Sequence, residues 1–488
     1  MQQLSEVISK HTPGIATYIT SIIFIIFLIL NISDDFDKIK QFVKRMLNFR
    51  KHVDTLIYSN KRGKYNDTLS TYKYLDWQNK VIQKIYGVLI EEKQSEFLKN
   101  HKENDFIPSI NLTKLRIGEK EETYESITLR LKPVEYPFDK ICDKELLERK
   151  PNLENENSEI KNKFKKEVNR YYRLIKQTIK YPDRLGYMLN DIVFDENEQQ
   201  WHIEAHAGVY KDNIKTSHIL EYELYKLYVR DVKNGLEMKE KSREEILDNL
   251  PIRKYIHDSF KNEKCDNKSE LQREANVLTS GRYRESLLGV QVFVMVKNRA
   301  DKYDILRIRR STEVAAKPGF IQFIPSGGFE AANDCTDMDS QWDNYSITKS
   351  VFRELLEECF GIDEDDKNIS ANNVSPDKIY NNKHIIKLVK YLRNEDNDYH
   401  AYMQLMGTSM NLVGLRQELS FILKIDDPDF SLEFIGNYES KSAIHMIDVN
   451  VMEKDLFWDE KDLQLLNCTS AGLYELARQN ELYKTCLK

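Results

Sequence analysis

Three glutamates on one face of a predicted helix are the residues best suited to chemistry. Glu354, Glu357 and Glu358 stand at positions i, i+3 and i+4, so a helix places their carboxylates side by side. Converging negative charges repel one another unless a cation lies between them, and hard divalent ions prefer oxygen ligands. The spacing therefore predicts a site for Mg²⁺ or Mn²⁺, with Arg353 placed to neutralise and orient part of the cluster.

An ordinary acidic helix face on the protein surface is the alternative, because clusters of glutamate are common. The preceding sequence favours the metal site. An apolar segment at 320–324 leads into Pro325-Ser-Gly-Gly-Phe-Glu330, and paired glycines let a backbone turn sharply and approach a ligand. Ser346 or Thr348 is expected to cap the helix, and Gly361 is expected to end it.

Predicted strands supply the scaffold for this turn and helix. Residues 290–296 are apolar and β-branched, and residues 303–309 alternate as a partner strand would. Arg309 and Arg310 at the end of the second strand are cations that could contact phosphates, although solvent-exposed strand ends explain them as well.

These residues resemble the Nudix hydrolase signature, G-x5-E-x7-R-E-U-x-E-E-x-G-U, in which U is aliphatic. Residues 353–358 match R-E-U-x-E-E in full, and the closing Gly361-Ile362 comes one residue late. Gly328 matches the opening glycine, but an acidic insertion at 331–345 lengthens the segment that follows. Counted from Gly328, Asp334 stands at the position of the first glutamate of the signature, and Glu330 is the other candidate.

The resemblance implies an α/β/α sandwich around a mixed sheet, and hydrolysis of a nucleoside diphosphate linked to another moiety. A late strand at 417–425 begins with a carboxylate that assists the metal in some members. The residues implied are catalytic Glu354, Glu357, Glu358 and Arg353, metal ligands Glu354, Glu357, Glu358 and Glu418, and ligand contacts Gly327, Gly328, Arg309 and Arg310. The insertion leaves open a domain that binds a nucleotide without cleaving it.

An apolar stretch without charged side chains lies near the N-terminus. Its core, residues 15–32, would rise about 27 Å as a helix, close to the roughly 30 Å of bilayer hydrocarbon. No signal-peptide cleavage site follows it, which favours a retained helix. Lysine and arginine are concentrated after the stretch, so the positive-inside rule predicts a single-pass inner-membrane protein with a cytoplasmic C-terminal part.

The expected organisation has five parts: a tail at 1–14, a transmembrane helix at 15–32, a mainly helical cytoplasmic region at 33–180, a lead-in α/β segment at 181–284 and a Nudix-like domain at 285–488. The net charge of −6 argues against direct DNA binding, which needs a clustered basic surface. The six cysteines form no C-x-x-C pair and fit a reducing compartment.

This architecture resembles the transmembrane-Nudix effectors of bacterial CBASS anti-phage systems. The resemblance implies activation by a nucleotide or cyclic oligonucleotide, assembly into a homo-oligomer on the lipid bilayer, membrane damage and abortive infection. Two alternatives stay open. One is a membrane-bound, Mg²⁺-dependent Nudix hydrolase of a nucleoside diphosphate derivative, and the other is a non-catalytic nucleotide sensor.

Overall fold

The computed structural model describes residues 58–487 except for several gaps, which are 101–105, 139–158, 177–184, 196–199, 235–240, 266, 312–318, 332–337, 361–378, 435–443, 455–457 and 459. The chain divides into two compact units, Met1–Lys64 and Tyr65–Lys488. Only the second unit is described over most of its length, and it contains every residue of the predicted site.

A mixed sheet forms the centre of this second unit. Its strand order is β1-β2-β9-β10-β5-β6-β11, with short β7 on β6 and short β8 on β5. Neighbours in the sheet are antiparallel except β5 and β10, which run parallel. The strands are β1 Ser109–Ile117, β2 Lys120–Glu135, β5 Gly289–Lys297, β6 Tyr303–Arg309, β7 Ile321–Phe323, β8 Ser326–Gly328, β9 Ala401–Asn411, β10 Arg416–Ile425 and β11 His445–Asp448.

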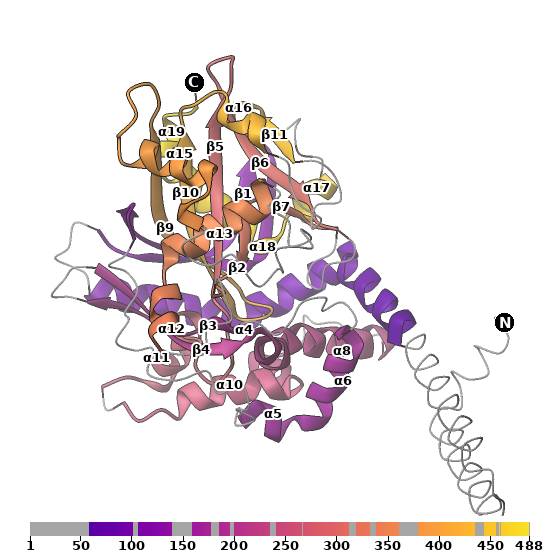
Figure 1. The fold of residues 1–488 in the computed structure, drawn as a ribbon. Coiled ribbons are helices and arrows are strands. Elements are labelled where there is room, and N and C mark those ends of the chain that lie inside the picture. The colour runs from indigo at the N-terminus through magenta and orange to yellow at the C-terminus, as the bar shows by residue number, and fades with distance from the viewer. Residues whose placement is uncertain are drawn as a thin grey trace, which may run out of the picture. The chain divides into compact units, whose positions relative to one another are not determined.

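Helices cover both faces of the sheet, because alternate side chains of each strand point to opposite sides. Val290, Val292 and Val294 of β5 share a core with α13 (Ile347–Cys359), α4 (Tyr72–Asn100) and α15 (Lys383–Leu392). Phe293 and Met295 lie in a second core with α18 (Cys468–Arg478). Figure 1 shows α13 in front of the strands.

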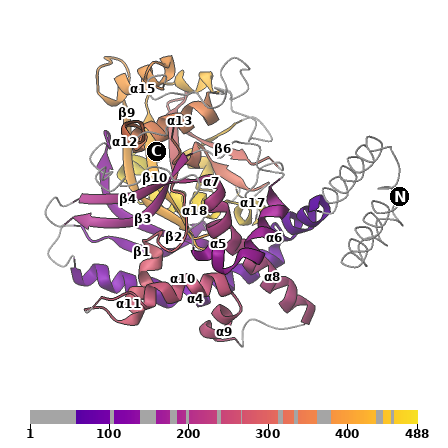
Figure 2. The ribbon, with the colours of Figure 1, turned by 60° about the horizontal axis from the view of Figure 1, so that its bottom comes forward.

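The remaining elements pack around this sheet. Helices α4, α10 and α11 lie side by side, as Figures 1 and 2 both show. Their bounds and those of the other elements are β3 Leu185–Asp195, β4 Gln200–Val209, α5 Glu159–Lys163, α6 Lys165–Ile175, α7 Tyr210–Asn213, the π-helix η2 Ile214–His218, α8 Ile219–Asn234, α9 Arg243–Asp248, α10 Pro251–Lys261, α11 Glu270–Ala275, η4 Asn276–Leu278, α12 Met338–Asn344, η5 Phe430–Glu433, α16 Val449–Met452, α17 Glu460–Gln464 and α19 Glu481–Lys484.

The predicted fold class and location both required a membrane-spanning helix. Within the described residues, every helix is too short or too polar to cross a bilayer. The expected span at 15–32 and the tail at 1–14 lie outside the described residues. On this finding the fold class is corrected to an α+β fold with a mixed sheet and helices, and the prediction of a single-pass inner-membrane protein is corrected with it.

The sheet crosses the boundaries expected at 181 and 285. Strands β1 and β2 come from the region expected to be mainly helical, yet β2 pairs with β9. The β3–β4 hairpin from the lead-in segment is bridged to Leu287 and Glu330. The three segments after residue 33 therefore do not form separate folded units in the described part of the chain.

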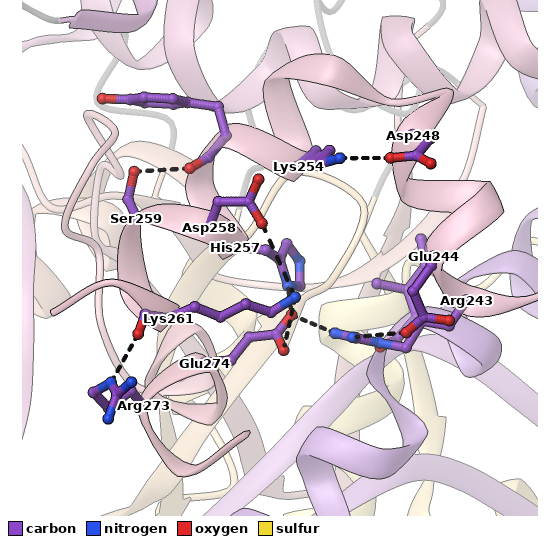
Figure 3. Close-up of polar contacts among 12 residues, drawn as sticks. Arg243, Glu244, Asp248, Lys254, His257, Asp258, Ser259, Lys261, Arg273 and Glu274 are labelled. Atoms are coloured by element: carbon purple, nitrogen blue, oxygen red, sulfur yellow. Dashed lines mark hydrogen bonds and ion pairs between the residues drawn. The ribbon is translucent and has the colours of Figure 1, made fainter. Parts of the chain in front are cut away.

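A buried ionic network joins four of the helices (Figure 3). Glu274 of α11 accepts a hydrogen bond from the Nη2 of Arg243 and pairs with Nδ1 of His257 at 2.7 Å. Its second oxygen lies 3.5 Å from Nζ of Lys261. His257 in turn lies 3.3 Å from the hydroxyl of Tyr86 in α4. Because breaking a buried pair leaves an uncompensated charge, this network holds α4, α9, α10 and α11 together.

His257 makes the stability of the chain depend on pH. Burial lowers its pKa to about 4, although Glu274 acts in the opposite direction. An unfolded histidine takes up its proton near pH 6.5, so acid favours the unfolded chain. The contribution of neutral His257 to the free energy of unfolding is complete above pH 6.5 and is lost as the pH falls towards 4. When the pH falls from 7 to 5.5, we expect the free energy of unfolding to decrease by about 1 kcal/mol more in the native chain than in the His257→Gln variant.

Urea denaturation of both proteins at the two pH values measures this difference. The exposed His445 is the matched control, and His445→Gln should lose as much stability as the native chain. Equal losses in the native chain and in His257→Gln would show that the buried imidazole does not titrate with a lowered pKa.

Candidate active site

Helix α13 begins at the predicted cap. The Oγ of Ser346 accepts a hydrogen bond from the backbone N–H of Lys349 at 3.3 Å, whereas Thr348 is buried inside the helix. Val351 and Leu355 are buried and hold the helix on the sheet. The last helical residue is Cys359, and the expected terminator at position 361 lies outside the described residues.

The glycine turn lies directly against this helix. Strand β8 pairs with β5 so that Gly327 faces Val290 and Gly328 faces Gly289. A Cβ atom on Gly327 would lie 2.0 to 2.2 Å from the three carboxylate atoms of Glu354. Only glycine at this position lets the carboxylate rest on the turn.

Arg353 connects the turn to the glutamates. Its Nη2 donates to the carbonyl oxygen of Gly328 at 2.7 Å and contacts Oε1 of Glu354 at 2.5 Å. Its Nη1 donates to both carboxylate oxygens of Glu357 at 3.0 Å. Glu358 accepts the backbone N–H of Ser326 at 2.6 Å. All three glutamates are therefore fixed relative to the turn.

The charges of the cluster act strongly on Arg353, which is 3% exposed. Burial lowers the pKa of its guanidinium, but Glu354, Glu357 and Glu330 outweigh burial and raise the pKa. Glu330 is therefore one of the carboxylates near this arginine. The other candidate for the first glutamate of the signature, Asp334, lies outside the described residues.

Glu418 approaches the turn from the other face of the sheet. Its neighbour in β10, Leu419, packs in the core beneath α13. Because successive side chains of a strand point to opposite faces, the side chain of Glu418 points towards α18. If Gly289 carried a Cβ atom, that atom would lie 2.7 Å from the Cγ of Glu418 and 3.2 Å from the carbonyl oxygen of Gly327. Burial raises the pKa of Glu418, against the opposing effect of Arg416.

The two predicted arginines have different surroundings. Arg309 pairs with Asp462 at 2.6 Å and donates to the carbonyl oxygen of Gly319 at 3.0 Å, away from the glycine turn. Arg310 donates to Gln322, whose amide donates to the carbonyl oxygen of Ser326 at 3.4 Å. Of these two side chains, Arg310 is the one that a chain of hydrogen bonds connects to the turn.

Sequence reasoning missed Arg416. The Nη2 of Arg416 would lie 3.0 Å from a Cβ atom placed on Gly289, and Glu418 approaches the same point. The two residues are two positions apart in β10, and residues so spaced share one face of a strand. That spacing was the signal that could have found it.

Neither the protein families nor the curated proteins contain a match to this chain. What the site can do therefore has to be inferred from the geometry of the turn, of α13 and of Glu418.

Both departures from the Nudix signature have a structural role. The insertion at 331–345 contains α12, and the hydroxyl of Tyr187 in β3 donates to the carbonyl oxygen of Gln341 at 3.0 Å. The insertion thus docks on the β3–β4 hairpin. The additional Phe360 stacks on His384 at 4.1 Å between ring centroids, which packs the end of α13 against α15.

The donor set suits a divalent cation in type. In the described part of the chain, acidic, histidine and cysteine side chains form no group of three already arranged to hold a metal ion. Arg353 instead pairs with Glu354 and Glu357. Two observations nevertheless fit a cation: the carboxylate of Glu354 rests where Gly327 has no side chain, and Oε2 of Glu418 is buried with no hydrogen-bond partner other than Thr469. Mg²⁺ or Mn²⁺ stays a prediction.

Proposed function

We propose that the chain hydrolyses a nucleoside diphosphate linked to another moiety, using Mg²⁺ or Mn²⁺. The observation that carries the proposal is the attachment of Arg353 to both the Gly328 carbonyl and the glutamates of α13. A surface helix with an ordinary acidic face would not need a buried arginine to fix its carboxylates against a glycine turn.

The residues would divide the work as follows. Glu354, Glu357 and Glu358 supply hard oxygen ligands, and Glu418 supplies a fourth from the opposite face of the sheet. A divalent ion held there would supply charge neutralisation at the diphosphate and would favour ionisation of a water molecule. One of the carboxylates would accept the proton of the attacking water. Arg353 is a positioning residue, because it holds the carboxylates through its own hydrogen bonds.

Metal-dependent turnover tests this function. The purified full chain is incubated with Mg²⁺ or Mn²⁺ and a panel of nucleoside diphosphate derivatives, and released products are separated by ion-exchange chromatography. We expect cleavage within the diphosphate that stops when EDTA removes the metal. Cleavage that continues in EDTA, or no cleavage of any panel member, would contradict the proposal.

A nucleotide sensor is the second candidate, and a separate cavity favours it. The cavity has a volume of about 420 Å³, and its lining includes Lys93, Lys268, Glu96, Arg282, Asp191 and Trp201. The aromatic ring suits a planar ligand, and an anionic one would compete with Glu96 and Asp191 for the three cations. Such a sensor is the non-catalytic alternative that the sequence left open. Calorimetric titration of the chain with cyclic di- and trinucleotides tests it, and no binding would reject it.

A further inference from the structure

Buried polar atoms without partners gather where α18 begins, on the face of the sheet opposite α13. In the described part of the chain, Oε1 of Gln291 and the Nε atoms of Arg310 and Arg416 lack a hydrogen-bond partner, and Oε2 of Glu418 and Oγ1 of Thr469 have no partner other than each other. These five residues are called the α18 cluster below. Buried polar atoms are nearly always paired, so several together call for a ligand, an ion or water.

Contacts between neighbouring strands bring the cluster together. Glu418 and Arg416 meet above Gly289, beside the carbonyl oxygen of Gly327. The amide of Gln291 donates to the carbonyl oxygen of Thr469 at 3.1 Å. Burial raises the pKa of Glu418, whereas the positive charge of Arg416, a hydrogen bond with Thr469 and the positive charge of Arg310 lower it.

Arg310 reaches the same end of α18 through a shared partner. It donates to Oε1 of Gln322, and the side-chain amide of Asn467 donates to the same oxygen at 3.4 Å. Asn467 is the N-cap of α18, yet its side chain accepts no capping hydrogen bond from the helix. The first N–H groups of a helix favour negative charge. Arg310 and this helix end therefore attract the same kind of ligand.

The composition of the α18 cluster selects the ligand. A lone anion would be repelled by Glu418, and a lone cation would be repelled by Arg310 and Arg416. A phosphate that carries a divalent cation satisfies both signs, because guanidinium groups bind phosphate oxygens and carboxylates bind the metal. Glu418, Thr469 and Gln291 are buried, whereas both arginines are partly exposed and can be reached from solvent.

We propose that Arg416 and Arg310 bind a phosphate of the substrate at the start of α18, with Glu418 between them and the glycine turn. The proposal rests on the proposed function, because it adds a phosphate-binding arm to the same site. The diphosphate of the substrate would then lie where β5 and β10 begin, between the side of the sheet covered by α13 and the side covered by α18.

Arg416→Gln and Arg310→Gln test the proposal in the full chain. A hydrogen bond to a charged group contributes about 1.5–3 kcal/mol, which corresponds to roughly 10- to 150-fold in affinity. We expect each variant to raise KM for a nucleoside diphosphate substrate by at least about 10-fold. We also expect kcat of Arg310→Gln to stay within about twofold, because this arginine is assigned neither to the reacting water nor to the metal ligands. Arg416→Lys should recover part of the loss, since it keeps the charge but not the planar fork.

Controls separate this effect from unfolding. Arg299 pairs with Asp429 at 2.8 Å on the surface, and its side chain is 71% exposed, so Arg299→Gln should leave KM unchanged. Thermal unfolding of each variant, measured by circular dichroism, shows whether it is folded. If Arg416→Gln fails to fold, Arg416→Lys and Arg310→Gln carry the test.

A binding measurement separates failure of this proposal from failure of the proposed function. Imidodiphosphate, which resists hydrolysis, is titrated into the chain in the presence of Mn²⁺. Binding that both substitutions to glutamine weaken, in a chain without turnover, would support the phosphate site and reject the hydrolase function. Turnover with unchanged KM, and unchanged imidodiphosphate binding in folded variants, would overturn the phosphate site and leave the hydrolase function intact.

Discussion

Replacing Glu357 and Glu358 together by glutamine is expected to lower kcat by at least about 10²- to 10³-fold, the cost of losing a main electrostatic contribution to catalysis. Glutamine has nearly the shape of glutamate, and its oxygen can still accept the N–H of Ser326 that Glu358 now accepts. The substitutions therefore remove two negative charges while keeping the turn in place. Arg353 keeps Glu354 as a charged partner.

Turnover and Mn²⁺ affinity should fall together in this double variant. Steady-state kinetics and isothermal titration with Mn²⁺ measure the two quantities. Glu244→Gln is the matched control, because its side chain is 73% exposed and lies in α9. Native turnover and native Mn²⁺ affinity in the folded double variant would refute the assignment of the glutamates of α13.

Gly327→Ala is expected to reduce turnover by about 10²-fold, because small displacements of a catalytic group are costly. The new Cβ would lie 2.0 Å from the nearest carboxylate oxygen of Glu354, closer than any real contact allows. The carboxylate must move off the turn, and its pairing with Arg353 must change. Substrate affinity should fall less than kcat, since the arginines on the α18 side are not displaced.

Gly87→Ala is the matched control for this substitution. Gly87 lies within α4, and a Cβ there would meet no atom within 4 Å. Alanine in a helix interior is favoured over glycine by about 0.5–1 kcal/mol, so this variant should be slightly more stable and equally active. If Gly327→Ala kept full activity, the contact between Glu354 and the turn would have no catalytic role.

Local pattern predicted the elements that carry the proposed chemistry. The i, i+3, i+4 spacing of the glutamates and the cap at Ser346 are properties of a single helix, and α13 has both. The alternation at 303–309 matches β6, and the apolar run at 290–296 lies within β5. Each of these signals lies within a few residues of the chain, where side-chain periodicity is reliable.

Contacts between distant segments could not be predicted in this way. The pairing of β2 with β9 joins residues such as Ile127 and Met410, and the sequence of either strand alone does not indicate which strand it pairs with. The same limit explains Arg309, whose pairing with Asp462 depends on how α17 docks. The membrane prediction rested on a hydropathy pattern at 15–32, outside the described residues, and no described helix repeats that pattern.

Because Arg353 already neutralises two of the carboxylates, folding of this domain would not require the proposed metal ion. A cluster of glutamates without such an internal counter-ion would repel itself in the empty protein, as happens in small domains that stay unfolded until a metal arrives. Here the arginine supplies the positive charge during synthesis. A cation entering the proposed site would compete with this guanidinium for its ligands, so occupancy of the site would follow the concentration of free ions.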